Sequence, residues 1–444
     1  TFFSSTPGVD YQLKFTYTDG NGCVNESAAV PFIVHPLPAP SIAIVGGATA
    51  YCETDGTAQL RLTDGTVSSN LNDNAGGELS RVTFEVQVNS IGAYQAVVAE
   101  VRVIPGAAAS DDRVLLDPVE LAKLGKDQTH RIRFTYTDAN GCVATSSPIA
   151  ITIHELPVPQ ITSVFSAAAN TGFCTDASTS TLTLQDDGTN IVINVGGGNV
   201  TFEVDYDRSG TYATPVAGTF TLVDGTNQVT FDPTKVPVGQ HFVRYLYRDG
   251  NGCSTYSVDY PIEIWALPTL TLSGLTDNQE FCSDAADILL TTDNNGNNLL
   301  NDLANVTFYI SSNGGTSFSL APTSLVEIDA VTAKTITFKP SSLTFFSSTP
   351  GVDYQLKFTY TDGNGCVNES AATPFIVHPL PTPSIAIVGG ATAYCETDGT
   401  VQLTLTDGTV STNLNDNAGG ELSRISFEVQ INSIGAYQPV VAEV

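Results

Sequence analysis

The first 101 residues of this chain recur at its end. Thr1–Val101 is repeated as Thr344–Val444, a shift of 343 positions, with nine substitutions between the copies. A single globular body has no use for a near-duplicate of part of itself, whereas a periodic polymer is built from such copies. Because the sequence also contains no methionine, we expect an interior segment of a longer modular chain.

The nine differences between the copies predict β-strands with one buried face. Val82 and Val88 are both isoleucine in the second copy, so volume and β-branching are kept at alternate positions. The intervening Thr83 becomes serine, and Arg61, which lies between two leucines, becomes threonine. Successive side chains of a strand point to opposite faces, and inward positions tolerate only volume-conserving changes.

A proline-rich junction divides the 343-residue period into three. His35-Pro-Leu-Pro, His154-Glu-Leu-Pro, Trp265-Ala-Leu-Pro and His378-Pro-Leu-Pro follow one another at intervals of 119, 111 and 113 residues. Each interval is the size of one β-sandwich domain, and alternate prolines favour a short, stiff extended linker. The predicted domains are therefore 37–155, 156–266 and 267–379. They are flanked by 1–36, the C-terminal part of a domain, and 380–444, the N-terminal part of another.

The charge of the chain excludes two classes of partner. It has 17 Lys and Arg against 46 Asp and Glu, a net charge of −29. Such a surface repels phosphate backbones and anionic lipids, so we expect neither nucleic acid binding nor direct membrane insertion. No apolar stretch reaches the ~20 residues needed to span a bilayer. Only 14% of residues are charged and 41% are hydrophobic, which is typical of a folded protein.

Short strands separated by turn residues fill each predicted domain. In 37–155, the only stretch favouring a helical turn is Pro118–Leu124. About seven strands at this spacing predict an all-β fold of tandem immunoglobulin-like or PKD-like antiparallel β-sandwiches, strung as an extended rod. The predicted strands are Ser41–Val45, Thr57–Thr63, Arg81–Val88 and Ala93–Val98 as a hairpin, Arg113–Leu116, and His130–Thr137 with Pro148–His154 as another hairpin.

The penultimate strand carries the strongest local motif. Phe134-Thr-Tyr-Thr-Asp-Ala-Asn-Gly-Cys142 and its three counterparts alternate aromatic residues with threonine, and Asn-Gly predicts a tight hairpin turn. Four residues before each leading aromatic is a residue suited to the tyrosine corner of immunoglobulin-like sandwiches. We expect His130 and His241 to replace the tyrosine there as structural hydrogen-bonding groups. The four corner positions are Tyr11, His130, His241 and Tyr354.

Together, the two periodic cysteines, the Tyr-Thr-Asp-x-Asn-Gly-Cys motif and the Leu-Pro-x-Pro junction resemble the tandem immunoglobulin-like repeats of giant Bacteroidota surface adhesins, of which the gliding-motility adhesins are an example. The resemblance covers the whole chain. It implies export through the gliding-associated secretion route, outer-membrane anchorage, and a role in attachment or surface movement.

Every domain contributes two cysteines. One precedes the second strand of the sandwich, and the other follows the Asn-Gly turn. An even, periodic set without a CxxC motif indicates a disulfide framework and an oxidising compartment outside the cytoplasm. The first group is Cys52, Cys174, Cys282 and Cys395, and the second is Cys23, Cys142, Cys253 and Cys366.

Two pairings of these cysteines are open. The intradomain scheme is Cys52–Cys142, Cys174–Cys253 and Cys282–Cys366. In an immunoglobulin-like order, however, the two cysteines of one domain lie at opposite ends of strands about 26–33 Å long, while bonded Cα atoms lie within ~7 Å. The interdomain scheme is Cys52–Cys253 and Cys174–Cys366, with Cys23, Cys142, Cys282 and Cys395 bonded to domains partly or wholly outside this segment.

Two oxygen-rich loops are candidates for calcium. Both lie between the second and third strands of their domains; one holds Asp73 and Glu78 and the other Asp293 and Asp302. Carboxylate and amide oxygens suit Ca²⁺, but the same residues also serve ordinary polar turns. The segment Asp205–Gly210 opens like an EF-hand loop but lacks the glutamate at the twelfth position, so we interpret it as a turn.

We expect no catalytic activity and no required cofactor. The sequence has no GxSxG, HExxH or phosphate-binding loop, and adjacent acids such as Asp111-Asp112 and Asp186-Asp187 are interpreted as solvated turns. The leading hypothesis is a structural and adhesive region of a giant surface fibre, located outside the cell, that displays a distal tip and transmits tension. Its partners are neighbouring repeats and, through regions outside this segment, surface polysaccharide or other cells. The alternatives are carbohydrate-binding or spacer modules of a secreted enzyme, and a subunit of a self-assembling filament or sheath.

Overall fold

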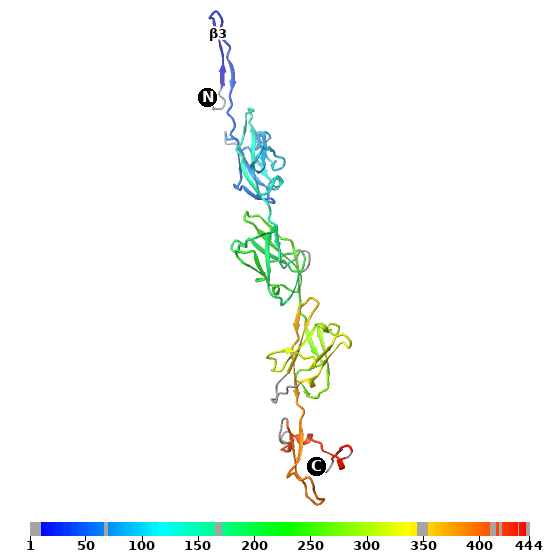
Figure 1. The fold of residues 1–444 in the computed structure, drawn as a ribbon. Coiled ribbons are helices and arrows are strands. Elements are labelled where there is room, and N and C mark those ends of the chain that lie inside the picture. The colour runs from blue at the N-terminus through cyan, green and yellow to red at the C-terminus, as the bar shows by residue number, and fades with distance from the viewer. Residues whose placement is uncertain are drawn as a thin grey trace. The chain divides into compact units, whose positions relative to one another are not determined.

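The computed structural model describes residues 10–65, 70–163, 165, 171–343, 354–408, 414–416, 420–433 and 435–440. Residues 1–9 and 344–353, at the start of the two sequence copies, are among those that lie outside the described ranges. The chain divides into two compact units, Thr1–Phe173 with Ala177–Glu263, and Cys174–Asp176 with Ile264–Val444. Nearly all regular structure is β-strand (Figure 1), so the prediction of an all-β fold is confirmed.

Residues 41–154 form a two-sheet sandwich. Its hydrophobic core, between Ile42 and Ile153, draws buried side chains from both sheets. The first sheet has the order β10 (Val101–Ile104), β11 (Arg113–Leu116), β7 (Ala58–Thr63) and β5 (Ser41–Ile44). The second has the order β6 (Ala50–Cys52), β14 (Ile149–His154), β12 (Gln128–Thr137), β8 (Val82–Gln87) and β9 (Gln95–Ala96), with β13 (Val143–Thr145) also on β12.

The core of this sandwich follows the predicted alternation. Ile132, Phe134 and Tyr136 of β12 are buried, and Phe134 lies opposite Phe84 in the antiparallel pair with β8. Leu60 and Leu62 of β7 are fully buried while Arg61 between them is exposed. Position 61, which is substituted between the copies, thus lies on the solvent-exposed face of β7, as its change to threonine indicates. The predicted helical turn is α1 (Pro118–Ala122), which begins after the capping carboxylate of Asp117.

The strand pairing corrects the purely antiparallel prediction. Strand β6, which the sequence pattern missed together with β10 and β13, pairs in parallel with β14, and Cys52 lies opposite His154. Three residues are too few to show an alternating pattern. The pairing brings Cys52 to the end of the sandwich from which the chain leaves toward the proline-rich junction.

Residues 159–265 and 270–378 repeat this arrangement of two sheets. In residues 159–265, the first sheet has the order β15 (Pro159–Ile161), β17 (Ser180–Asp186), β21 (Gln228–Phe231) and β20 (Phe220–Leu222), and β18 (Thr189–Asn190) also pairs with β17. The second sheet has the order β16 (Thr171–Cys174), β24 (Tyr260–Trp265), β22 (Gly239–Arg248) and β19 (Val200–Asp205), and β23 (Ser254–Tyr256) also pairs with β22. In residues 270–378, the first sheet has the order β25 (Leu270–Ser273), β27 (Ile288–Asn294), β32 (Thr335–Phe338) and β31 (Val326–Asp329), and β28 (Asn297–Asn298) also pairs with β27. The second sheet has the order β26 (Gln279–Cys282), β35 (Thr373–His378), β33 (Tyr354–Thr361), β29 (Val306–Ser311) and β30 (Ser319–Leu320), and β34 (Val367–Glu369) also pairs with β33. Strand β26 is again parallel to β35.

The two flanking stretches contain isolated two-stranded pairs. Near the N-terminus, β1 (Asp10–Leu13) pairs with β4 (Val30–Ile33) and β2 (Thr16–Thr18) with β3 (Val24–Glu26). Near the C-terminus, β36 (Pro383–Ile387) pairs with β37 (Leu403–Asp407) and β38 (Glu428–Val429) with β39 (Gln438–Pro439). Among the described residues, no helix has the length and apolar character of a membrane-spanning segment.

Candidate functional site: the cysteine junctions

Two disulfides connect successive sandwiches. Cys52 is bonded to Cys253 and Cys174 to Cys366, across sequence separations of 201 and 192 residues, with Cα–Cα distances of 5.6 Å in both. Each bond joins the first cysteine of one sandwich to the second cysteine of the next. This is the interdomain scheme, and the intradomain scheme (Cys52–Cys142, Cys174–Cys253, Cys282–Cys366) is not the pairing of this structure.

The other four cysteines carry no disulfide in the structure. Cys23 is the repeat counterpart of the bonded Cys366, and Cys395 is the counterpart of the bonded Cys52. Cys142 and Cys282 occupy the same positions in their sandwiches as the bonded residues. Their bonding to further domains stays a prediction.

A five-residue loop presents the second cysteine of each sandwich. In the loop that ends at Cys253, the Asp249 carboxylate accepts the backbone N–H groups of Asn251 and Cys253 at 3.0 and 2.8 Å, and the Asp249 N–H donates to the Cys253 carbonyl. The tight hairpin turn that the sequence predicts is present, with the Asn251-Gly252 pair at its end: the Gly252 N–H donates to the Asp249 carbonyl at 3.2 Å. The aspartate side chain closes the loop, and Gly252 alone of this pair takes a positive φ, of 91°.

The same loop recurs at the other second cysteines. Asp138 and Asp362 accept the N–H groups of Cys142 and Cys366 at 2.8 and 2.9 Å. In the N-terminal copy, the N–H of Cys23 donates to Asp19 at 2.9 Å, and this bond, followed by that from Asn21, holds the pKa of Asp19 below its ordinary value. A cysteine is thus delivered by one fixed backbone geometry whether or not it is bonded.

The first cysteine is fixed to the exit of its own sandwich. The residue that follows it donates its backbone N–H to the carbonyl of the junction residue: Glu53 to His154 at 2.9 Å, Thr175 to Trp265 at 3.0 Å and Ser283 to His378 at 2.8 Å. These bonds continue the parallel strand pair by one residue. They keep each first cysteine beside the start of the proline-rich junction.

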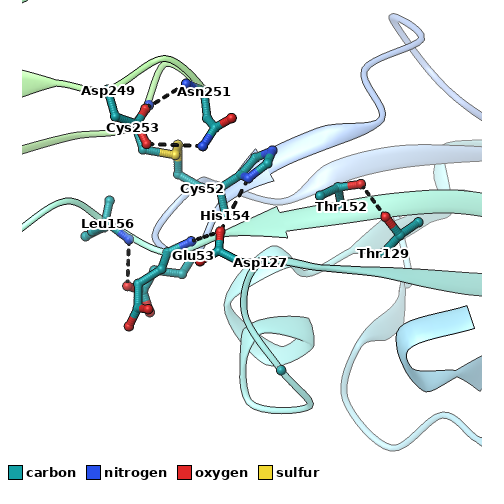
Figure 2. A network of polar contacts seen from close by, with 12 residues as sticks. Cys52, Glu53, Asp127, Thr129, Thr152, His154, Leu156, Asp249, Asn251 and Cys253 are labelled. Atoms are coloured by element: carbon teal, nitrogen blue, oxygen red, sulfur yellow. Dashed lines mark hydrogen bonds and ion pairs between the residues drawn. A yellow bond between two sulfur atoms is a disulfide. The ribbon is translucent and has the colours of Figure 1, made fainter. Parts of the chain in front are cut away.

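A carboxylate–ammonium network strengthens the first of these junctions. Lys126 contacts Glu53 at 2.7 Å and Glu155 at 2.9 Å, and Glu53 also accepts the backbone N–H of Leu156 at 3.1 Å. Figure 2 shows Glu53 and Leu156 beside the Cys52–Cys253 bond. The Lys126 ammonium, and secondarily the Leu156 N–H, lower the pKa of Glu53, and Glu53 followed by Glu155 raises the pKa of Lys126.

The following sandwich holds the other end of each junction. Val158 donates its N–H to the Asp186 carboxylate at 2.6 Å, and its carbonyl accepts the N–H of Asp187 at 3.0 Å. Asn294 and Asn295 hold Thr269 in the same way at 3.0 and 2.8 Å. Asp186 is therefore a structural acceptor at the end of β17, which corrects its interpretation as part of a solvated turn.

A second acidic pair also has a structural member. Asp112 is buried and accepts the backbone N–H of Gly106 at 2.8 Å. The interpretation of Asp111-Asp112 as a solvated turn is thus wrong for Asp112. Hydrogen bonding to the backbone compensates the burial of its carboxylate.

The corner histidines have the predicted structural role. His241 is buried, and its Nε2 and Nδ1 atoms lie 2.8 and 2.7 Å from the carbonyl oxygens of Pro237 and Tyr206. His130 is fully buried, and its Nε2 atom lies 3.0 Å from the Gly125 carbonyl oxygen. Each ring therefore fixes the start of its strand by bonding to the backbone just upstream, as a corner tyrosine does.

Three of the four calcium candidates already accept hydrogen bonds from protein groups. Glu78 accepts the N–H of Gly76 at 2.9 Å and Asp293 that of Gly296 at 2.6 Å. Asp302 accepts hydrogen bonds from Asn305 and from the Tyr360 hydroxyl, which raises the pKa of Tyr360 to about 12. Asp73 caps a short 3-10 turn without a side-chain hydrogen bond. Within the described ranges, no group of three histidine, cysteine or acidic side chains is arranged to hold a metal ion.

No protein-family model and no curated protein matches the sequence. Among solved structures, the chain is similar to the Ca²⁺-stabilised adhesin that helps an Antarctic bacterium reach out and bind ice, with 14% identity, 83% of this chain and 82% of that chain covered, and a TM-score of 0.30. It is similar to a 1.5-MDa bacterial ice-binding adhesin, with 15% identity, coverages of 77% and 98%, and a TM-score of 0.28. It is also similar to mouse cadherin-23 EC22-24, with 11% identity, coverages of 77% and 99%, and a TM-score of 0.23. At these scores, the similarities define neither the function of the chain nor the arrangement of its parts.

Proposed function

We propose that this chain is a structural, adhesive repeat region of an extracellular cell-surface fibre, built from sandwich domains at 37–155, 156–266 and 267–379, that transmits tension to a distal adhesive tip. The single observation that carries the proposal is the pairing of cysteines from successive sandwiches. Two core clusters, within 42–153 and 275–377, support the first and third domain boundaries. The resemblance of the sequence motifs to those of Bacteroidota adhesins supports attachment or gliding as the purpose of the fibre.

A pulling force along the fibre would pass from one sandwich to the next through the junctions. A β-sandwich held only by hydrogen bonds and apolar contacts can be unravelled along its whole length. Here the junctions that begin at His154 and Trp265 are each spanned by a disulfide in addition to the backbone, and the residues on both sides of these two proline-rich segments are held by backbone hydrogen bonds. Disulfides form and persist in oxidising compartments, which supports a location outside the cytoplasm.

Immunogold electron microscopy of the source cells, with antibodies raised against this chain, tests the proposal. We expect labelled thin fibres that extend from the cell surface and disappear when the gene is deleted. Adhesion of the deletion strain to a solid surface should fall with them. Labelling confined to the cell interior, or fibres that persist in the deletion strain, would overturn the proposal.

A further inference from the structure

The second sandwich leaves partly exposed a tyrosine that the other two sandwiches bury. Tyr136, Tyr247 and Tyr360 occupy the same position in the aromatic motif of the penultimate strand, and each lies opposite the valine that begins the neighbouring strand of its sheet. Tyr136 and Tyr360 are only 4 and 6% exposed, and each belongs to the core of its sandwich. Tyr247 is only half-buried, so its ring can meet a ligand.

A glycine stands where the other two sandwiches have a buried leucine. Three residues before the paired valine, the first sandwich has Leu79 and the third has Leu303, and each is buried in the same core cluster as the tyrosine. The second sandwich has Gly197 there, between two further glycines. Glycine has no side chain with which to cover an aromatic ring, so the tyrosine of the second sandwich stays open to solvent.

The hydroxyl of this tyrosine also lacks the partner found in the third sandwich. There, the Tyr360 hydroxyl donates to Asp302, which lies four residues before the paired valine. The corresponding residue of the second sandwich is Gly196. Among the described residues, no group accepts a hydrogen bond from the Tyr247 hydroxyl. The hydroxyl is therefore available to a ligand.

Tyr247 lines an open recess of about 500 Å³. This volume is within the range of small-molecule sites in proteins. All of the lining residues lie between residues 186 and 250, so a single domain builds the recess. Besides Tyr247, the lining includes Asp186, Asn190, Ile191, Arg248 and Asp249.

Several polar groups of the recess have hydrogen-bonding capacity left. Asn190 uses its Oδ1 atom to accept from a glutamine of β17 at 3.0 Å, which leaves its amide N–H groups. Arg248 donates from Nε to the backbone at 3.2 Å, and its two terminal nitrogens have no partner among the described residues. Asp186 uses one carboxylate oxygen for the N–H of Val158, which leaves the other oxygen. The recess thus combines amide and guanidinium donors with a carboxylate acceptor beside one aromatic ring.

We propose that this recess binds one residue of a neutral saccharide, which packs a face of its ring on Tyr247. A sugar ring presents C–H groups on its faces, and a tyrosine offers apolar area together with a hydroxyl. Sugar hydroxyl groups both donate and accept, so neighbouring hydroxyls can satisfy the Arg248 and Asn190 donors and the Asp186 acceptor at once. This inference does not rest on the proposed function, because a saccharide site on one sandwich requires neither a fibre nor tension.

The charges around the recess favour a neutral ligand. Burial, followed by the nearby Asp186 and Asp249 carboxylates, raises the pKa of Tyr247. The hydroxyl therefore stays protonated at neutral pH and can donate to a ligand. The same two carboxylates repel an anionic ligand, and Arg248 repels a cationic one.

Binding of the full chain to an array of neutral oligosaccharides tests the proposal. The array holds glucan, mannan, galactan and xylan fragments, with hyaluronate as the anionic comparison, in about 0.15 M salt to screen long-range charge effects. We expect saturable binding to at least one neutral class and weaker binding to hyaluronate. Binding to none of the neutral classes, or to hyaluronate alone, would overturn the proposal.

Two substitutions connect the binding to this recess. Tyr247→Ala removes the ring and Arg248→Ala the guanidinium donors, and we expect each to weaken saccharide binding about tenfold or more. Arg248 is exposed, so its replacement should keep the fold even if Tyr247→Ala does not, as circular dichroism would verify. Arg131→Ala, at an exposed arginine of the first sandwich, is the matched control and should bind as the parent chain does. Equal binding by Arg248→Ala and Arg131→Ala would refute the site.

Gly197→Leu gives the second sandwich the leucine of the other two. A Cβ atom at Gly197 would lie 2.7 Å from the side-chain nitrogen of Asn194, so that flexible side chain must turn aside. The leucine should then cover the ring of Tyr247, and saccharide binding should be lost while circular dichroism shows an unchanged fold. A folded Gly197→Leu chain that binds as the parent does would show that the recess is not the site.

Discussion

Glu53 accepts the backbone N–H of Leu156 at 3.1 Å, although the two residues are 103 positions apart. Glu53 directly follows Cys52, and Leu156 is the leucine of the proline-rich junction. The contact therefore connects the turn that holds the disulfide to the segment that leaves the sandwich. The Glu53 carboxylate is thus one of the groups that fix the position of the junction.

Glu53→Gln should loosen the junction in a pH-dependent way. The pKa of Glu53 is lowered from its ordinary value of 4.5, chiefly by Lys126. A carboxylate with a lowered pKa in the folded state contributes stability above its ordinary pKa, and this contribution is lost as pH falls through the lowered value. We expect the protection of residues 154–158 against amide hydrogen exchange to fall about two- to five-fold at pH 7, the scale of a partly exposed ion pair.

The difference between the variant and the parent chain should shrink as the pH falls from 4.5 through the lowered pKa of Glu53, since below that pKa both side chains are neutral. Glu396→Gln is the matched control, because Glu396 is the exposed repeat counterpart of Glu53. It should leave residues 154–158 unchanged. A difference that stays constant from pH 7 to pH 3 would show that the charge of Glu53 is not involved.

Asn72→Ala should destabilise the first sandwich. Asn72 is buried; its Oδ1 atom accepts the Leu62 N–H at 2.7 Å and its Nδ2 atom donates to the Leu60 carbonyl at 2.9 Å. Alanine leaves both backbone groups without these partners, at a cost of about 2 kcal/mol or more. Hydrogen exchange of residues 58–63 should accelerate about 30-fold. The exposed Asn297→Ala is the control, and equal exchange in both variants would contradict the assigned role.

The periodic features of the fold could be predicted from the sequence. Buried and exposed residues alternate along β7, β8 and β12 because one face of each strand is exposed to solvent. The substitutions between the copies at Val82 and Arg61 follow this alternation. The interdomain pairing of Cys52 with Cys253 could be proposed from strand length, since intradomain partners would lie at opposite ends of a sandwich. Sequence alone could not choose between the two pairings.

The remaining parts of the junction depend on long-range contacts. Strand β6 has three residues and is defined by its parallel pairing with β14, about a hundred positions away. Asp186 resembles any acidic turn residue until its contact with Val158 is seen. The aspartate of the Asp-x-Asn-Gly-Cys motif was a stronger signal than the Asn-Gly pair, because an aspartate can accept two backbone N–H groups and set the loop by itself.

Removal of calcium should leave the stability of the sandwiches unchanged. Glu78 and Asp293 already accept backbone N–H groups of their own loops, and Asp302 accepts from two side chains. These bonds satisfy the carboxylates without a cation. The midpoint of thermal unfolding should agree within about one degree in 1 mM EDTA and in 1 mM calcium chloride, given that ~1 kcal/mol shifts such a midpoint by several degrees. A rise of several degrees with calcium, abolished by Asp293→Asn, would establish a calcium site.

The two disulfides overlap along the chain, which predicts a distinct response to force. Cys174 lies between Cys52 and Cys253, so the shortest covalent route from Cys52 to Cys366 crosses both bonds and only the stretch from residue 174 to residue 253. At about 3.5 Å per extended residue, that stretch measures about 280 Å. The uninterrupted backbone from residue 52 to residue 366 measures about 1,100 Å. Stretching the oxidised chain between handles just outside Cys52 and Cys366 should therefore stop near the shorter length.

Addition of a reductant under tension should release the remaining length, about 800 Å by the same scale. Serine at Cys23, Cys142, Cys282 and Cys395 provides the background in which neither intermolecular links nor other pairings can form. In that background, Cys52→Ser with Cys174→Ser should extend to the full length without reductant. An oxidised chain that reaches about 1,100 Å before any disulfide is cleaved would show that the junction bonds do not carry the force.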